Sequence, residues 1–341
     1  MDNYPWKTKG IVLTAPMIRD VELVARFIEE YLAGKVNLIV MQTRYRYQFR
    51  SHPECIGGEP LSYENVKALV RAARNANIRM IPKMNLLGHQ SGLHNVPTDG
   101  ILHGGLGCVP TEPDGLLRAY PEFDETPELR DVYYSRHLCP SHPKILPIVL
   151  DMVDELMDVY EADGIHIGCD EGLTVCKCPR CRDRDPGDVF GGWVESIGQH
   201  VRAGGGELML WADRFLDDKL VHYGEWGSSA NGTHRAIDIV SKSTVMCDWH
   251  YESRAEFGNA YPSVDLFGEK GFEMFISPWN ELQPAKDFIA YAKAHDRGHI
   301  RGVLATTWCN SGELAAHLLD GRPTLWPKLP GVVEVLKYLL E

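Results

Sequence analysis

The sequence lacks the features that direct a chain to a membrane or to nucleic acid. No apolar run is long enough to span a bilayer, and the start, MDNYPWKTKG, has neither the basic end nor the apolar stretch of a signal peptide. Positive charge is in deficit: 35 Lys and Arg stand against 47 Asp and Glu, so the formal net charge is −12. Such a chain repels phosphate backbones and anionic lipids. We therefore expect a soluble, cytoplasmic protein that binds neither nucleic acid nor membranes.

Paired cysteines and interdomain linkers are not expected either. Nine cysteines is an odd number, so at least one lacks a partner, and reduced thiols are favoured where no export signal is found. No low-complexity tract, tandem repeat or Pro/Gly-rich linker divides the chain. We expect one domain over residues 1–341.

What the chain does contain is a regular alternation of short apolar runs and amphipathic stretches. Continuous apolar strands separated by helices predict a parallel sheet buried on both faces, and eight such units predict a (β/α)₈ TIM barrel. A doubly wound open sheet is the alternative, but no GxGxxG follows the first run. The runs lie at 10–15, 36–41, 78–84, 164–168, 207–212, 244–249, 273–279 and 302–308, with helical patterns at 20–33, 62–76, 141–160 and 284–295.

In such a barrel, function is expected at the carboxyl ends of the strands. Trp211, Trp249, Trp279 and Trp308 lie at four of these ends. They are either ordinary packing or, as we prefer, a cage for the apolar C–H face of a sugar. About 50 residues after the third strand, 88–140, show no clear helix; long loops of this kind are usually functional. We interpret this loop as a lid or substrate-binding loop, with a solvated insertion as the alternative.

The fourth strand ends in two adjacent carboxylates, Asp170 and Glu171, which Gly168 and Gly172 bracket. Neighbouring strand side chains face opposite sides, but glycines allow a bend that brings both acids to one cavity. Two close carboxylates repel when ionised, so one should keep its proton to higher pH. A protonated acid beside an ionised one suits cleavage of a glycosidic bond. The alternative is a surface Asp-Glu pair at the start of a loop.

These residues resemble a known family. DGIHIGCDE (163–171) resembles the H-x-G-G-D-E signature of glycoside hydrolase family 20, the β-N-acetylhexosaminidases. IPKMNLLGHQ (81–90) resembles the family's I-P-E-x-D-x-P-G-H segment, and residues 138–160 resemble its L-N-P segment and the helix that follows. The chain is most similar to the hexosaminidase D branch, which shares Cys169 and the Trp249-x-Tyr251 pair.

The resemblance implies an exo-acting, retaining enzyme that removes terminal β-linked GlcNAc or GalNAc. In this family the substrate's own 2-acetamido oxygen attacks the anomeric carbon and forms an oxazolinium ion, without a cofactor. Glu171 would be the general acid and then the base, Asp170 would orient the acetamide, and Tyr251 would donate to its oxygen. The four tryptophans would wall the sugar. His89 and His166 match family histidines, which we expect to support the acids.

At three positions the chain departs from the family's means of binding sugar hydroxyls. Lys9 stands nearest to an Arg of strand one, residues 42–49 lack the Asp of strand two, and Asn310 follows Trp308 where Trp-x-Glu is usual. The choice between GlcNAc and GalNAc is therefore open. The hypothetical replacements are Arg44, Glu281 and Asn310.

A cysteine cluster follows the acids. Cys176-x-Cys178-x-x-Cys181 offers three of the four ligands that tetrahedral zinc needs, and Cys169 or a loop histidine is a candidate fourth. A turn with reduced thiols, or a local disulfide, is the alternative. Zinc here would tie down a loop rather than catalyse.

Other functions compete with this one. A metal-dependent barrel hydrolase would need H-x-H after the first strand, where TAPM (14–17) stands. A catalytically silent sugar-binding barrel and a glycosidase with Glu281 or Glu313 as nucleophile are further alternatives. The expected partner is an N-acetylhexosamine glycan, and a homodimer is possible because a lone barrel exposes surface that a second copy would cover.

Overall fold

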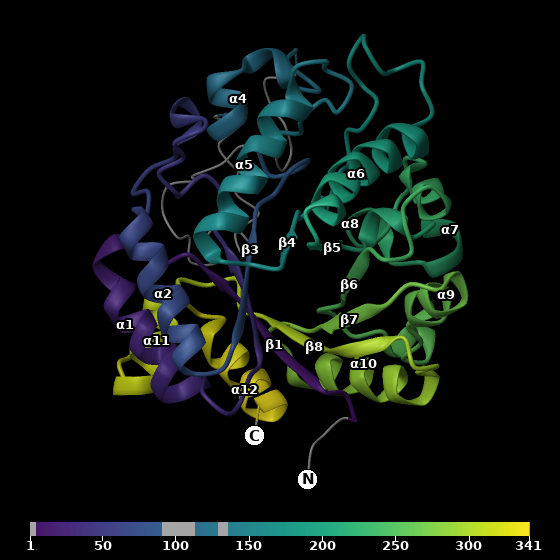
Figure 1. Cartoon of the computed structure of the whole chain (residues 1–341). Coiled ribbons are helices and arrows are strands. Elements are labelled where there is room, and N and C mark those ends of the chain that lie inside the picture. Colours follow the sequence, from purple (N-terminus) through teal and green to yellow (C-terminus); the bar gives the residue numbers. More distant parts are fainter. Residues whose placement is uncertain (1–4, 91–112, 129–135, 341) are drawn as a thin grey trace.

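Eight parallel strands close into a barrel in chain order, with β1 paired to β8, in a computed structural model that describes residues 5–90, 113–128 and 136–340 (Figure 1). This confirms the predicted TIM barrel. The strands are β1 (Thr8–Thr14), β2 (Leu38–Gln42), β3 (Arg79–Lys83), β4 (Gly164–His166), β5 (Glu207–Trp211), β6 (Val245–Trp249), β7 (Met274–Ser277) and β8 (Ile300–Thr306).

Helices surround the strands on the outside of the barrel (Figure 1). Side-chain caps begin several of them: the Ser62 hydroxyl accepts from the Asn65 amide to start α2, and Asp185 with Pro186 starts α6. The helices are α1 (Val21–Arg26, continued by a π-helical turn over Phe27–Leu32), α2 (Tyr63–Asn75), α4 (Gly115–Ala119), α5 (Ile145–Tyr160), α6 (Pro186–Ala203), α7 (Asp218–Val221), α8 (Gly224–Gly227), α9 (Pro262–Lys270), α10 (Leu282–His295), α11 (Ser311–Asp320) and α12 (Leu329–Leu340). None of the described helices is long and apolar enough to cross a membrane.

The strands separate two hydrophobic cores because their side chains alternate between the barrel interior and the helices. The interior core fills the barrel, and the half-buried Trp249 and Trp308 pack on it. Its buried members are Val12, Leu38, Val40, Ile81, Met209, Trp211, Val245, Cys247, Phe275 and Leu304. A packed interior leaves the ends of the strands as the places where a ligand can bind.

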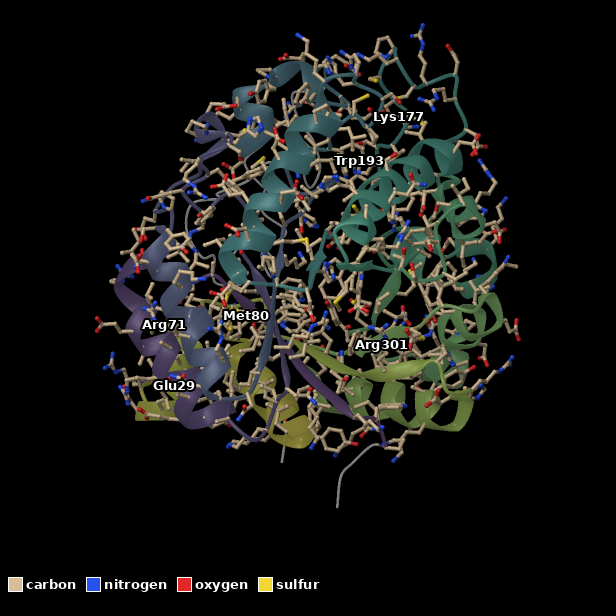
Figure 2. All side chains as sticks on the ribbon, in the orientation of Figure 1. Glu29, Arg71, Met80, Lys177, Trp193 and Arg301 are labelled. Carbon is tan, nitrogen blue, oxygen red and sulfur yellow. The ribbon has the colours of Figure 1, made fainter. Side chains whose placement is uncertain are left out.

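Charged residues gather at the amino-terminal end of the barrel. Arg79 and Arg301 both pair with Glu207, and Arg301 also pairs with Glu273; Arg301 is labelled in Figure 2. These ion pairs join the beginnings of β3, β5 and β8. Chemistry is expected at the opposite end.

The loop after β3 contains more regular structure than the sequence indicated. Helix α4 and a 3-10 turn over Pro121–Phe123 lie within 88–140, where we expected no helix. Gly115 begins α4 with φ of 45°, and a Cβ there would lie 2.2 Å from the ring of Tyr45, so close packing fixes this glycine. The lid prediction falls largely on 91–112 and 129–135, which lie outside the described residues.

Candidate active site

The backbone after β4 is unusual. Gly168, Cys169 and Glu171 all have left-handed φ, at 68°, 67° and 51°. Such values cost non-glycine residues free energy and gather at functional sites. A Cβ on Gly168 would lie 2.4 Å from Asn85 Oδ1, so this position requires glycine, as expected. Gly172 does not adopt such a φ, and the bend depends on Cys169 and Glu171 instead.

Both carboxylates turn toward one imidazole. His89 Nε2 lies 3.0 Å from Asp170 Oδ2 and 3.3 Å from Glu171 Oε2. The three side chains are only 14–16% exposed. Burial lowers the pKa of His89, but the charge and hydrogen bond of Asp170 and the charge of Glu171 outweigh it and raise the pKa. The adjacent acids therefore reach the same site, and a histidine joins them.

Asp170 is held in its ionised form. Burial alone would raise its pKa, but the charge and hydrogen bond of His89 and the charge of Lys83 together hold the pKa below its usual range. The other carboxylate oxygen, Asp170 Oδ1, is buried and has no hydrogen-bond partner among the described residues. This oxygen is able to accept a hydrogen bond from a ligand.

A lysine supplies positive charge from the barrel interior. Lys83 Nζ donates to Gln42 Oε1 at 3.0 Å and to Asn85 Oδ1 at 2.5 Å. It lies 5.7 Å from the ring centroid of Trp211 and 5.6 Å from that of Trp308. Burial lowers the pKa of Lys83 to about 8. We did not single out Lys83 from the sequence, although alternation from the inward-facing Ile81 places it inside the barrel.

The main chain of Glu171 is held from two sides. Its N–H donates to Asp213 Oδ2 at 2.9 Å, and Arg214 Nε donates to the same oxygen at 2.7 Å. Its carbonyl accepts from His137 Nε2 at 2.9 Å, while the Thr174 hydroxyl lies 2.7 Å from His137 Nδ1. Burial lowers the pKa of His137 to about 4, so the ring is neutral. Neither His137 nor Asp213 was among the predicted site residues.

The predicted aromatic residues form one cluster around Tyr251. The Trp308 indole donates to the Tyr251 oxygen at 2.8 Å. The Tyr251 ring centroid lies 5.0 Å from Trp249 and 5.2 Å from Trp279, and Trp211 lies 5.6 Å from Trp308. Trp211 is fully buried, so it forms the floor, whereas Trp249 and Trp308 are half-buried.

The charges of the two acids also affect the pKa of Tyr251. Burial raises the pKa of Tyr251 far above its usual value, and the charges of Asp170 and Glu171 raise it further. The phenol therefore keeps its proton. Because its oxygen accepts from Trp308, with Thr306 as a second hydrogen-bond neighbour, its proton is directed to Thr306 or to a ligand.

Two of the other predicted residues contact the site. Arg44 donates to the carbonyl of His89 at 3.0 Å. His166 is fully buried, with its ring centroid 4.5 Å from that of Trp211. Its Nδ1 accepts from the Gly168 amide at 3.1 Å, and burial and Lys83 hold the pKa of His166 well below its usual value. Its Nε2 is buried without a partner in the described part of the chain.

The remaining candidates have more ordinary positions. Glu281 is exposed at the amino end of α10. Asn310 caps α11, because its Oδ1 accepts from the amides of Gly312 and Glu313. Lys9 lies at the start of β1, beside a basic hollow at the amino end of the barrel. It therefore cannot replace an arginine at the carboxyl ends of the strands, where the site lies.

Among the described residues, two groups of side chains have the spacing of metal ligands. One is His89, Asp170 and Glu171, which the hydrogen bonds above already explain. In the other, Cys178 and Cys181 meet two further buried residues, and neither Cys176 nor Cys169 belongs to the group. This group differs from the predicted one because the chain folds residues from the loop after β3 against this turn. The second group is Glu125, Cys139, Cys178 and Cys181.

Comparisons with known proteins find similar sequences and a similar fold. The model of the glycosyl hydrolase family 20 catalytic domain matches residues 38–336. Lacto-N-biosidase of Bifidobacterium bifidum is 21% identical over 236 residues, 63% of this chain and 18% of that protein. A β-hexosaminidase of Akkermansia muciniphila is 23% identical over 277 residues, 75% of this chain and 50% of that protein. The chain thus spans half or less of these relatives.

Solved structures share the fold. The chitobiase of Flavobacterium johnsoniae aligns with a TM-score of 0.62 and 18% identity, over 97% of this chain and 48% of that one. At such identity the likeness shows the architecture alone. Membership of the hexosaminidase D branch stays a prediction, as does the single domain over 1–341.

Proposed function

Because the chain belongs to glycosyl hydrolase family 20, we propose that it removes terminal β-linked N-acetylhexosamine with retention, through attack by the substrate's own acetamide. The observation that carries this proposal is the Asp170 carboxylate. It is held ionised by His89 and Lys83, and its buried Oδ1 has no hydrogen-bond partner among the described residues, which leaves an acceptor for a ligand N–H beside Glu171. Family membership supports the chemistry, and the cluster around Tyr251 supports a sugar as ligand.

The first step needs an oriented acetamide. Asp170 Oδ1 accepts the acetamide N–H, and its charge stabilises the positive charge that develops as the acetamido oxygen bonds to C1. The Tyr251 hydroxyl donates to that oxygen and aligns it for attack. Asp170 is already held by His89 and Tyr251 by Trp308, so these groups need little reorganisation in the transition state.

Proton transfer falls to Glu171. It gives its proton to the glycosidic oxygen as the C1–O bond breaks, which releases the alcohol and leaves the oxazolinium ion. It then takes a proton from the water that attacks C1, so the acetamide is restored and the β-configuration retained. The Asp213 and His137 hydrogen bonds fix the main chain of Glu171, which supports a constant position in both steps.

The sugar's other hydroxyls set the specificity. Arg44 lies beside His89 and is our preferred group for binding them. Glu281 and Asn310 remain weaker candidates because one is exposed and the other caps a helix. A cytoplasmic location and a homodimer stay predictions of the sequence.

Turnover of simple glycosides tests the proposal. Nitrophenyl β-GlcNAc and β-GalNAc should be cleaved, while nitrophenyl β-glucoside, which lacks the acetamide, should react at least about 10³-fold more slowly. Equal rates on all three would favour a glycosidase with a protein nucleophile. Sugar binding without turnover would favour the silent barrel, and loss of turnover with a chelator in protein that stays folded would favour the metal hydrolase.

Replacing Tyr251 by Phe should reduce kcat by about 10- to 100-fold, because it removes one donor to the attacking oxygen. Steady-state kinetics should show a smaller change in KM. Tyr261→Phe is the matched control: its hydroxyl is buried without a hydrogen bond to any described residue, and its ring packs on Phe288. A Tyr251 variant as active as this control would remove the tyrosine from the mechanism.

The lysine inside the barrel should shape the pH dependence. As pH rises past about 8, Lys83 loses its proton and Asp170 loses a nearby positive charge, so kcat/KM should decline with an apparent pKa near 8. Lys83→Met should lack this decline and be about tenfold less active at pH 7. Lys7→Met, an exposed change at the other end, should keep the wild-type profile.

As pH rises, the contribution of Lys83 to folding stability should change in the opposite direction from its contribution to kcat/KM. Its folded pKa, about 8, lies below its ordinary 10.5, so between these values the unfolded chain binds more protons. The contribution of this group to stability therefore rises with pH across that window. The activity profile gives the contradicting outcome. If the alkaline decline of kcat/KM persisted in Lys83→Met, that decline would belong to another group.

A further inference from the structure

Three thiols and a carboxylate meet behind the active site, and we propose that Glu125, Cys139, Cys178 and Cys181 bind a structural zinc ion. Cys139 Sγ lies 3.2 Å from Cys178 Sγ, which lies 3.2 Å from Cys181 Sγ. Cys181 Sγ lies 2.9 Å from Glu125 Oε1. The four ligand atoms lie within 4.8 Å of one another, and all four residues are buried.

The spacing suits tetrahedral coordination. Zinc–sulfur bonds of about 2.3 Å place tetrahedral sulfurs roughly 3.8 Å apart. The thiols would therefore separate by only about half an ångström to admit the ion. Thiolate and carboxylate ligands together favour a borderline ion such as Zn²⁺ over Mg²⁺ or Ca²⁺. Binding would release the three thiol protons to solvent.

Glu125 is the second, independent indication of a cation. Its side chain is fully buried. Oε1 accepts from the amides of Lys177 at 2.5 Å and Cys178 at 3.1 Å, but Oε2 has no hydrogen-bond partner among the described residues. Among the described residues no Lys, Arg or His forms an ion pair with Glu125, since Arg136 pairs with Asp124 and Arg214 pairs with Asp213. A buried carboxylate without a positive partner is costly, and a metal ion would supply the missing charge.

The backbone brings the four ligands together from two loops. Glu125 N–H donates to the His137 carbonyl at 2.9 Å, and Cys139 N–H donates to the Phe123 carbonyl at 2.7 Å, so paired segments of the loop after β3 carry two ligands. The Cys181 amide closes a turn onto the Cys178 carbonyl at 3.1 Å in the loop after β4. Lys177 marks this turn in Figure 2, at the end of the molecule far from Arg301.

The arrangement does not resemble a disulfide. Cys178 lies equally close to two thiols, so pairing it with either would leave the third beside the Glu125 carboxylate. Cys176 is the natural candidate from the C-x-C-x-x-C spacing, but it adopts a left-handed φ of 63° and, although its thiol is hydrogen-bonded with Cys181, it lies outside the group of four ligand atoms. We assign it no ligand role.

The ion would stabilise the active site indirectly. Glu125 is bonded to the main chain of His137, whose ring holds the carbonyl of Glu171. A metal that joins the loops would limit movement of that histidine. Loss of the metal should lower the thermal midpoint of unfolding under conditions where kcat is still unchanged.

Metal content tests the proposal independently of activity. The full chain, purified under reducing conditions, should contain stoichiometric zinc by mass spectrometry of the metal. Co²⁺ exchanged into it should show the visible bands of a tetrahedral site and thiolate charge-transfer absorption. Removing the metal with a chelator should lower the thermal midpoint, and adding zinc should restore it.

Variants test the ligand set. Cys178→Ser and Glu125→Gln should each weaken zinc binding at least about tenfold, while Cys176→Ser, in the same turn, should retain it. Wild-type protein without zinc and without a Co²⁺–thiolate spectrum would overturn the proposal, as would a disulfide between any of the three cysteines under native conditions. Loss of metal in Cys176→Ser but not in Glu125→Gln would overturn the assignment of ligands.

Discussion

Replacement of Glu171 by Gln should lower kcat/KM by about 10³-fold for an alkyl β-glycoside of N-acetylglucosamine. Its leaving group is a poor one and needs the proton that glutamine cannot give. For a dinitrophenyl glycoside, whose leaving group departs unprotonated, the first step should be nearly normal. The loss should therefore grow steadily with the pKa of the leaving group, which steady-state kinetics over a series of aryl glycosides would measure.

Glu281→Gln is the matched control for this result. Glu281 is exposed at the start of α10 and is one of the two residues, with Glu313, that a mechanism with a protein nucleophile could use. It should retain wild-type turnover. An inactive Glu281→Gln would favour a mechanism with a protein nucleophile. If Glu171→Gln lost the same factor for every leaving group, Glu171 would not be the general acid.

Replacement of Asp170 by Asn should cost about 10²- to 10³-fold in kcat for all leaving groups alike. The amide presents no negative charge to the forming oxazolinium ion, and its NH₂ group faces either His89 or the substrate. Because Asp170 is held ionised by His89 and Lys83, the wild type should keep its activity well below pH 5, where an ordinary carboxylate begins to protonate.

Parallel measurements on His89→Gln separate the hydrogen bond that His89 gives to Asp170 from its positive charge. This variant retains a donor for Asp170 but not a positive charge, so the acidic limb of its pH–rate profile should move to higher pH. A profile identical to that of the wild type would show that His89 does not support the carboxylate. Leaving-group dependence in Asp170→Asn would contradict the division of roles between the two acids.

Much of the fold was predictable because its signals are local and repeated. Eight apolar runs, each followed by a helical pattern, are typical of a (β/α)₈ barrel, and closure brings the ends of all strands together. The four tryptophans and Tyr251 could therefore be placed in one cluster before any contact was known. Asp170 and Glu171 stood out for the same reason, at the end of β4.

What escaped prediction depends on contacts between distant segments. His137 and Glu125 lie in a loop whose sequence has no period, so nothing local indicates that they approach Glu171 and the cysteines. Cys139 lies outside the C-x-C-x-x-C spacing, 37 or more residues before it. Lys83 replaces the glutamate of the family pattern, and its burial follows only once the inward face of β3 is known.

The backbone bend after β4 was only partly predictable from the sequence. Gly168 marks it, but the left-handed φ values of Cys169 and Glu171 are unfavourable in isolation. Surrounding contacts enforce them, among them the Asp213 and His137 bonds to Glu171.

Progressive fluorination of the substrate's acetamide tests the central claim most directly. If its oxygen is the nucleophile, kcat/KM for nitrophenyl glycosides should fall steeply from acetyl to monofluoro-, difluoro- and trifluoroacetyl, by orders of magnitude in total. Rates that stay within a few-fold across the series would mean that the acetamide only binds, and that another group attacks C1.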